Sequence, residues 1–263
     1  MPQLEPAQRR SADMVIFGMP MHRVGVPELH EFIERAVREN RKSLIFNVNI
    51  HCMVLALSHP WLKGAMNEAH LVYCDGDGVR WGARLLGYAP PPKVGFTRWM
   101  WDLAAFCEKK KFRLYLLGGK PGIAAMAAEK MKQRYPDLEI AGTGHGYFKK
   151  EGPEGDQVID AINRSVAHIL VIGFGMPVQE KWIMENWEKI QTNVFLPGGA
   201  VLDYAAGALG QAPAWMVAAH LEWLFRIWED PKRLFGRYVY DIPVFFWNIL
   251  KEKFFGGKKP SGR

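Results

Sequence analysis

The stretch YCDGDGVRWG, residues 73–82, places two carboxylates, Asp75 and Asp77, where an apolar strand-like run changes into a helix-like run. Aspartate oxygens at such a point can bind a divalent cation, take a proton as a general base, or accept hydrogen bonds from the first amides of the helix. Asp77 directly precedes the helical run, so we expect it to cap that helix. The DxD pattern by itself is weak support for a metal site, and Asp75 stays open between base and metal ligand.

Two glycine-rich turns follow later strand-like runs. LLGGKPG contains Gly118, Gly119 and Lys120, and GFGMPVQE contains Gly175 and Gln179. Glycines let backbone amides approach a ligand closely, and a helix N-terminus suits a phosphate. Neither turn has the spacing of a P-loop or of GxGxxG, so a tight strand-to-helix turn is the structural alternative.

Polar side chains also follow other strand-like runs. Asn47 and Asn49 lie in FNVN, where strand alternation points both to one side. His145 and Tyr147 lie between glycines in GTGHGYF. An isolated histidine is more often structural than catalytic, so His145 carries little weight.

These residues need a scaffold, and the chain indicates one. Short apolar runs alternate with helical patterns at residues 14–17, 43–49, 71–74, 112–118, 138–143, 168–175 and 193–199. The runs are apolar on both faces, as strands buried under helices are. This predicts an α/β fold with a mostly parallel, Rossmann-like sheet and helices on both faces. Ligands bind at the carboxyl ends of such strands, where the residues above lie.

The strand pattern stops near residue 205. We therefore expect an α/β catalytic domain over residues 1–205 and a helical, aromatic and basic appendage over residues 206–263. The chain of 263 residues has a net charge of +7, and residues 226–263 hold nine basic against four acidic residues, a net +5. Such a patch favours polyanions, either anionic lipid or nucleic acid.

The appendage carries an apolar stripe at helical spacing, formed by Ile242, Phe246, Ile249, Leu250 and Phe254. With lysines around it, this stripe is typical of a helix lying in a membrane interface; packing against the catalytic domain is the alternative. The run 239–250 is too short to span a bilayer. Three cysteines without a CxxC pair and an N-terminus without a secretory pattern favour a cytoplasmic setting.

Four blocks in this order resemble the WecG/TagA/CpsF glycosyltransferases of bacterial cell-surface polymer synthesis, over about residues 14–240. They are DGDGVRWGARLLG, LYLLGGKPGIAAMAAEKMKQRYPDLEIAGTGHGYF, LVIGFGMPVQEKW and LEWLFRIWEDPKRLFGRYV. The resemblance implies transfer of a sugar from a UDP-sugar to an undecaprenyl-diphosphate-linked sugar, at the inner face of the cell membrane. It implies inversion of the anomeric centre, no metal, and no cofactor besides the donor substrate.

The resemblance also implies roles for individual residues. Asp75 matches the general base, Asn49 matches a polar residue of the catalytic site, and Gln179 matches a residue that contacts the donor or acceptor sugar. Arg226 and Arg233 match arginines of the C-terminal appendage, which closes over the active site and stabilises the departing UDP. A further set matches the donor-binding cleft: Asn47, Gly118, Gly119, Lys120, Gly175 and Arg237.

Three departures from the family pattern leave the donor sugar open. Lys93 in KVGFTRW stands where the family has arginine, Gly236 replaces a cationic residue, and Gln211 begins QAP where the family has RAP. N-acetylmannosamine, its uronic acid, glucose and glucuronic acid all remain possible donors. A DxD metal-dependent transferase is the first alternative, and a nonenzymatic protein binding anionic lipid or nucleic acid is the second. We expect no nucleic-acid partner, and monomer and small oligomer stay open.

Overall fold

The computed structural model describes residues 9–256, apart from the side chains of residues 232 and 233. A six-stranded sheet of order β4-β3-β8-β7-β5-β6 forms its centre, and every neighbouring pair is parallel. The strands are β3 (Ser43–Val48), β4 (Leu71–Cys74), β5 (Leu114–Gly118), β6 (Ile140–Gly144), β7 (Ile169–Gly173) and β8 (Val194–Pro197). The predicted α/β fold with a parallel sheet is confirmed.

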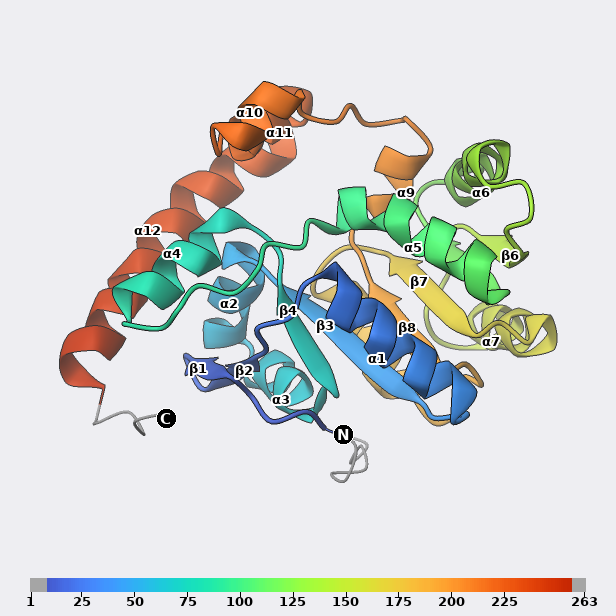
Figure 1. Ribbon diagram of the computed structural model, residues 1–263, viewed down its shortest axis with the longest axis horizontal. Helices are drawn as coiled ribbons and strands as arrows, with labels where there is room; N and C mark the ends of the chain where they lie inside the picture. The colour runs from blue at the N-terminus through green and yellow to red at the C-terminus, as the bar shows by residue number, and fades with distance from the viewer. Residues whose placement is uncertain (1–8, 257–263) are drawn as a thin grey trace.

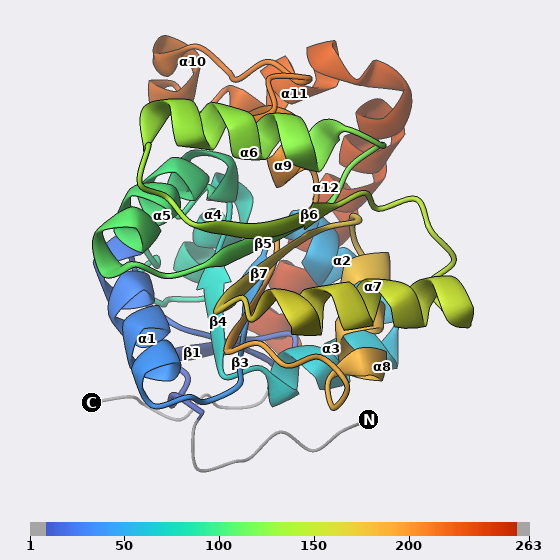
Figure 2. The ribbon, with the colours of Figure 1, turned by 90° about the vertical axis from the view of Figure 1, so that its right-hand side faces the viewer.

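Helices cover both faces of this sheet (Figures 1 and 2). Successive strand residues alternate between two buried clusters, so that Phe46 belongs to one and Ile45 to the other. The first cluster includes residues of α2 (Ile50–Ser58), α3 (Pro60–Glu68), α4 (Asp77–Leu85), α7 (Pro153–Ser165) and α8 (Val178–Asn186). The second includes residues of α1 (Val26–Arg38), α5 (Phe96–Lys110), α6 (Ile123–Arg134) and α9 (Val201–Ala205).

The first apolar run does not join this sheet, which corrects one expectation. Instead, β1 (Met14–Ile16) pairs antiparallel with β2 (Met19–Met21) in a separate two-stranded sheet. Phe17 and Gly18, both with positive φ (53° and 71°), make the turn between the two strands. A two-residue turn of this kind reverses the chain at once, so the run pairs with its immediate neighbour.

Three helices end the described chain: α10 (Ala214–Ala218), α11 (Glu222–Glu229) and α12 (Pro231–Phe255). They begin after α9, close to the boundary predicted at residue 205. The long α12 runs beside α2 and α4 and packs against both (Figure 1). Among the described residues, no helix has the length and apolar character needed to cross a bilayer.

The apolar stripe predicted on α12 divides between two environments. Ile249 is 0% exposed and belongs to the core beneath α12, so at this position the packing alternative is correct. Leu250 and Phe254 are exposed, together with the neighbouring Trp247 and Phe255. Ile249 is buried because α12 lies close to α4 at this point: a β-carbon at Gly82 of α4 would contact Phe245 and Ile249. One part of the predicted stripe is therefore buried, and the other part is exposed beside Trp247 and Phe255.

Candidate active site

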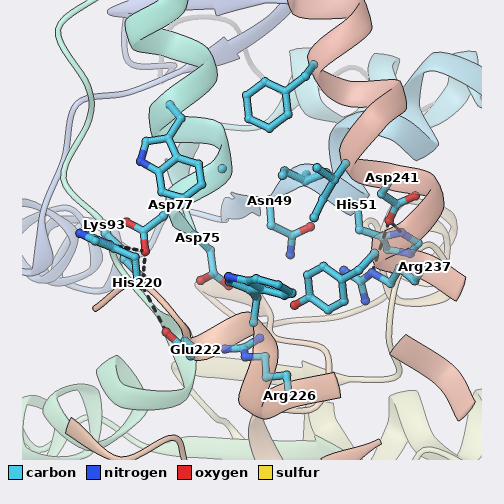
Figure 3. Close-up of a pocket in the computed structure, with 18 residues that line it drawn as sticks. Asn49, His51, Asp75, Asp77, Lys93, His220, Glu222, Arg226, Arg237 and Asp241 are labelled. Atoms are coloured by element: carbon cyan, nitrogen blue, oxygen red, sulfur yellow. Dashed lines mark hydrogen bonds and ion pairs between the residues drawn. The ribbon is translucent and has the colours of Figure 1, made fainter. Parts of the chain in front are cut away.

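A pocket of about 310 Å³ lies past the carboxyl ends of β3 and β4, enclosed by α2, α4, α11 and α12 (Figure 3). This volume is at the lower end of the range for small-molecule sites. Four carboxylates line the pocket: Asp75, Asp77, Glu222 and Asp241. Three basic side chains and two histidines face them: Lys93, Arg226, Arg237, His51 and His220. The structure thus brings together four residues predicted from sequence, namely Asn49, Asp75, Arg226 and Arg237.

The ends of two adjacent strands place Asn49 and Asp75. Strands β3 and β4 pair in parallel, and the amide of Asp75 donates to the carbonyl of Val48 at 2.8 Å. Asn49 then caps α2, because its Oδ1 accepts from the amide of Cys52 at 3.0 Å. The Asp75 carboxylate and the Asn49 amide consequently line one pocket at the N-terminus of α2, which is the positive end of that helix.

The glycines of the DGDG motif shape the turn that carries Asp75. Gly76 has φ +116°, a backbone conformation that side-chain-bearing residues rarely adopt. A β-carbon at Gly78 would clash with the side chain of Ile50, so the missing side chain lets α4 approach α2. The motif therefore serves backbone geometry at its glycines and leaves the two aspartates for chemistry.

Asp77 does not cap α4, which corrects the expectation from sequence. Gly76 is the N-cap residue and Asp77 is the first residue of the helix. The Asp77 carboxylate instead accepts from Arg80 at 2.9 Å and from Lys93 at 2.8 Å, and it lies 3.0 Å from Nδ1 of His220. Its oxygens are thus occupied by cationic groups that fasten the loop at residue 93 to α4.

Glu222 extends this network to the C-terminal helices. One of its oxygens accepts from Lys93 at 3.2 Å and the other from Arg226 at 2.7 Å. Lys93 therefore links Asp77 on α4 with Glu222 on α11. Lys93, which departs from the family pattern, thus joins the α/β scaffold to α11 through two ion pairs.

The two aspartates of DGD have opposite pKa shifts. Burial raises the pKa of Asp75 to about 6, with Glu222 adding to the effect and the charges of Arg226, Lys93 and Arg237 opposing it. Burial also acts on Asp77, but hydrogen bonds from Lys93 and His220 hold its pKa below the ordinary value. Paired carboxylates with separated pKa values are typical of acid–base sites, and the one titrating nearer neutrality suits the base.

The pocket also contains a pair that sequence reasoning missed. Nδ1 of His51 lies 2.7 Å from Oδ2 of Asp241, and Nε of Arg237 lies 3.6 Å from the same oxygen. Asp241 is 6% exposed and comes from α12, whereas His51 lies in the first turn of α2. One indication of this pair was present in the sequence, because Asp241 is a charged residue that interrupts the apolar run 239–250.

Gln179 lies away from the pocket lining and has a structural role. It is 0% exposed, and its Oε1 accepts from the amides of Gly175 at 3.2 Å and Gly199 at 2.9 Å. Its Nε2 donates to Glu180. An amide committed to these bonds fixes the loops after β7 and β8, and the expected contact of Gln179 with a sugar stays a prediction.

The other predicted binding residues also lie outside the pocket lining. Asn47 is 4% exposed within β3, and Lys120 is exposed after β5. Gly118 and Gly119 lie against Gly173 at the ends of β5 and β7. A contact of these residues with the donor stays a prediction. Arg233 belongs to α12, but its side chain lies outside the described part of the chain.

Within residues 9–256, no three His, Cys, Asp or Glu side chains are grouped so that they could hold one metal ion. Asp75 and Asp77 are the pair that a DxD site would use. The Asp77 oxygens are already engaged by Arg80, Lys93 and His220. The donor set here therefore fits charge pairing better than ligation of a cation by both aspartates.

Comparison with known proteins identifies the family of this chain. Residues 14–259 match the family model described as "Glycosyl transferase WecG/TagA/CpsF family". A protein of Bacillus spizizenii is 26% identical over 215 residues, covering 82% of this chain and 81% of the relative. A protein of Staphylococcus aureus strain MW2 is 27% identical over 209 residues, covering 80% of each chain. Both are named N-acetylglucosaminyldiphosphoundecaprenol N-acetyl-beta-D-mannosaminyltransferase. The chain is a glycosyltransferase and belongs to the WecG/TagA/CpsF family.

Proposed function

We propose that this enzyme transfers a sugar from a UDP-sugar to a sugar carried on a polyprenyl diphosphate, with inversion at the anomeric carbon and without a metal. The observation that carries the proposal is Asp75, a carboxylate whose pKa is raised to about 6 in a pocket also lined by Arg226 and Arg237. A base and cations in one pocket meet the two needs of the reaction.

In this mechanism the acceptor hydroxyl oxygen attacks the anomeric carbon from the face opposite the diphosphate. Its proton passes to the Asp75 carboxylate as the new glycosidic bond forms. The bond from the anomeric carbon to the β-phosphate oxygen breaks, and the electron pair leaves with UDP. Arg226 and Arg237 then stabilise the charge that develops on the diphosphate, and Asp75 returns its proton to solvent.

Arg226 forms an ion pair with Glu222 at 2.7 Å. A diphosphate entering the pocket offers this guanidinium several acceptor oxygens in place of one carboxylate. Arg226 and Lys93 both contact Glu222, so donor binding and the position of α11 are coupled through that residue. This coupling supports the view that the C-terminal helices close over the donor.

The names of the relatives support the acceptor class, because they specify an N-acetylglucosaminyl diphosphoundecaprenol acceptor. We assign the same class of lipid-linked acceptor to this chain and place the reaction in the synthesis of an exopolysaccharide or cell-wall polymer. Lys93 occupies the position that differs from the family pattern, so the donor sugar has to be determined by experiment.

We also propose that the enzyme binds the inner face of the cell membrane through α11 and α12. Trp228, Phe254 and Phe255 are 84%, 70% and 87% exposed, which is unusual for large apolar side chains. Lys251 and Lys253 lie on the same stretch of α12. Aromatic side chains with adjacent lysines are typical of helices that lie in an anionic membrane surface. The basic residues beyond position 256 lie outside the described residues.

The experiment that tests the proposed function is a donor panel. UDP-N-acetylmannosamine, its uronic acid, UDP-glucose and UDP-glucuronic acid are each incubated with N-acetylglucosaminyl-diphospho-polyprenol, with and without EDTA. We expect one donor to release UDP at the same rate in EDTA and to give a product of inverted anomeric configuration by NMR. Turnover that requires a divalent cation would favour the DxD alternative, and a retained configuration would contradict the mechanism.

A further inference from the structure

The pocket wall contributed by α12 changes character along the helix. Arg237 and Asp241 lie one turn apart at its charged end. Tyr238, Ile242 and Phe246 follow one another at four-residue spacing, and all three line the pocket. At a rise of 1.5 Å per residue, the distance along the axis from Arg237 to Phe246 is about 13 Å. One wall therefore passes from charged to hydrocarbon within a single pocket.

The facing elements complete the apolar end. Ile50 comes from the first turn of α2, and Trp81 comes from the second turn of α4, where its side chain is 44% exposed. The absence of a side chain at Gly78 brings α4 close to Ile50. Three helices thus contribute apolar side chains to the same end of the pocket. A large tryptophan left partly exposed in a concave wall is typical of a surface that a ligand covers.

The charged end has the opposite chemistry. Arg226 and Arg237 lie there, and His51 is oriented by Asp241 beside them. The N-terminus of α2 adds amides, because Asn49 and His51 belong to its cap and first turn and that turn has no acidic residue. In the proposed function this end holds the diphosphate of the donor and the sugar of the acceptor, and a hydrocarbon fits the other end.

We propose that the surface formed by Ile50, Trp81, Ile242 and Phe246 binds the first isoprenoid units of the acceptor's polyprenyl chain. This inference rests on the proposed function, because the acceptor is then an amphiphile with sugar and diphosphate at one end and hydrocarbon at the other. Only an acceptor of this kind places an apolar chain directly beside a diphosphate. The order of polarity in the pocket matches the order of groups in that molecule.

The ridge continues out of the pocket. Leu250 and Phe254 follow Phe246 at the same four-residue spacing, and they are 40% and 70% exposed. Rows at this spacing form continuous ridges that wind slowly around a helix. The rest of the polyprenyl chain thus has an apolar path from the pocket along α12. That path ends at the aromatic surface that we assign to the membrane.

The test uses soluble acceptors in the absence of detergent and vesicles. N-acetylglucosaminyl diphosphates carrying one, two, three or four isoprene units are compared by kcat/KM at a fixed UDP-sugar concentration. Burying one methylene group favours binding about fourfold. We expect the wild type to gain at least tenfold between one and three units and then to level off. Phe246→Gln and Trp81→Gln should each reduce this gain to less than threefold.

Trp247→Gln is the matched control. Trp247 is the next residue on α12, is 59% exposed and is not among the residues that line the pocket. It should keep the wild-type dependence on chain length. The affinity of each variant for UDP, measured by calorimetry, and its melting temperature report on folding and on the donor site separately.

Each outcome decides the assignment. A loss of chain-length dependence in both pocket variants, with unchanged UDP affinity, supports it. A wild-type dependence retained in both variants would overturn it. A large loss of UDP affinity with an unaltered dependence would assign the apolar end to the uracil base instead. Turnover of every acceptor without any chain-length effect would overturn the inference alone, whereas UDP binding without turnover of any acceptor would overturn the proposed function together with it.

Discussion

His51 and Asp241 join the two halves of the site: Nδ1 of the imidazole lies 2.7 Å from the carboxylate, across a separation of 190 residues. The contact attaches α12 to the first turn of α2 beside the pocket. Arg237 approaches the same carboxylate at 3.6 Å, so one buried acid positions both side chains. Loss of this acid should therefore disturb the attachment of α12 and the geometry of Arg237 together.

Asp241→Ala is expected to lower the free energy of unfolding by about 1 to 3 kcal/mol, because it leaves hydrogen-bonding groups of His51 and Arg237 without their buried partner. It should also weaken UDP binding, because Arg237 loses its orientation. Urea unfolding and calorimetry with UDP check both effects. Asp160→Ala, at an exposed position on α7, is the control and should change neither. Equal behaviour of the two variants would show that the His51 contact does not hold α12.

The rate should depend on pH through Asp75. Its pKa is raised to about 6, and the base must be ionised to accept a proton. Below pH 6, kcat/KM should therefore rise about tenfold per pH unit, and it should level off above that value. Asp75→Glu should keep a pH-dependent rise, although at a lower rate, because the carboxylate is displaced. A wild-type profile that is flat from pH 4.5 to pH 7 would contradict the assignment.

Stability should depend on pH with opposite signs at the two aspartates. The pKa of Asp75 is raised in the folded state from an ordinary value of 3.8 to about 6, so the folded state binds this proton more tightly and stability falls as pH rises from about 4 to 6. Asp75→Asn should thus be more stable than the wild type at pH 8, by on the order of 3 kcal/mol. The difference should disappear near pH 4.

Asp77→Asn is the matched comparison. The pKa of Asp77 is lowered, so its stabilising effect is present at neutral pH and is lost as pH falls through that lowered pKa. This variant should be less stable than the wild type at pH 8, because Lys93 and Arg80 lose their partner. Melting temperatures at pH 4, 6 and 8 measure both variants. If both substitutions shifted the melting temperature at pH 8 in the same direction, the opposite pKa shifts of Asp75 and Asp77 would be contradicted.

Arg226 should contribute to chemistry more than to donor affinity. Arg226→Gln removes a guanidinium that stabilises the departing diphosphate, so kcat should fall by about 10²- to 10³-fold. Steady-state kinetics with the active donor gives the effect. Arg35→Gln, a surface ion-pair residue on α1, should leave kcat unchanged. An Arg226→Gln variant with normal kcat and only a raised KM would restrict this arginine to substrate binding.

Membrane association should depend on the exposed aromatic side chains. The double variant Trp228→Ser and Phe255→Ser removes two side chains that are 84% and 87% exposed. It should lose most of its flotation with vesicles containing anionic lipid, while UDP affinity is retained. Tyr147→Ser, which removes a 68% exposed aromatic residue from a different part of the surface, should float as the wild type does. Flotation of both variants to the same extent would place the membrane contact elsewhere.

The sequence allowed the scaffold and part of the site to be predicted. Apolar runs on both faces of the strands are a local property, and they indicate a parallel sheet wherever they alternate with helices. Asn49 and Asp75 follow adjacent parallel strands, so their meeting at one edge follows from topology. Arg226 and Arg237 could be predicted as site residues only from the family resemblance, because nothing local in α11 or α12 indicates where those helices pack.

Other parts of the site depend on contacts between distant residues. The partner of His51 is 190 positions away, and no periodicity reports it. Asp77 had the position of a cap, but Arg80, Lys93 and His220 compete for its oxygens. Gln179 is also hydrogen-bonded to the amides of Gly175 and Gly199, which lie after two different strands, and its contact with a sugar stays a prediction. In each case a polar side chain satisfies buried partners that only the folded chain brings near.

The role of Asp75 as the base is tested by comparing the wild type with Asp75→Asn in UDP binding and UDP release, using the active donor, the lipid-linked acceptor and EDTA. Removing the negative charge should leave UDP affinity equal or higher, since Asp75 shares the pocket with the diphosphate. The rate of UDP release should fall at least 10³-fold, because an amide in place of the Asp75 carboxylate cannot accept the proton of the acceptor hydroxyl. A variant that binds UDP and still transfers within tenfold of the wild type would show that Asp75 is not the base.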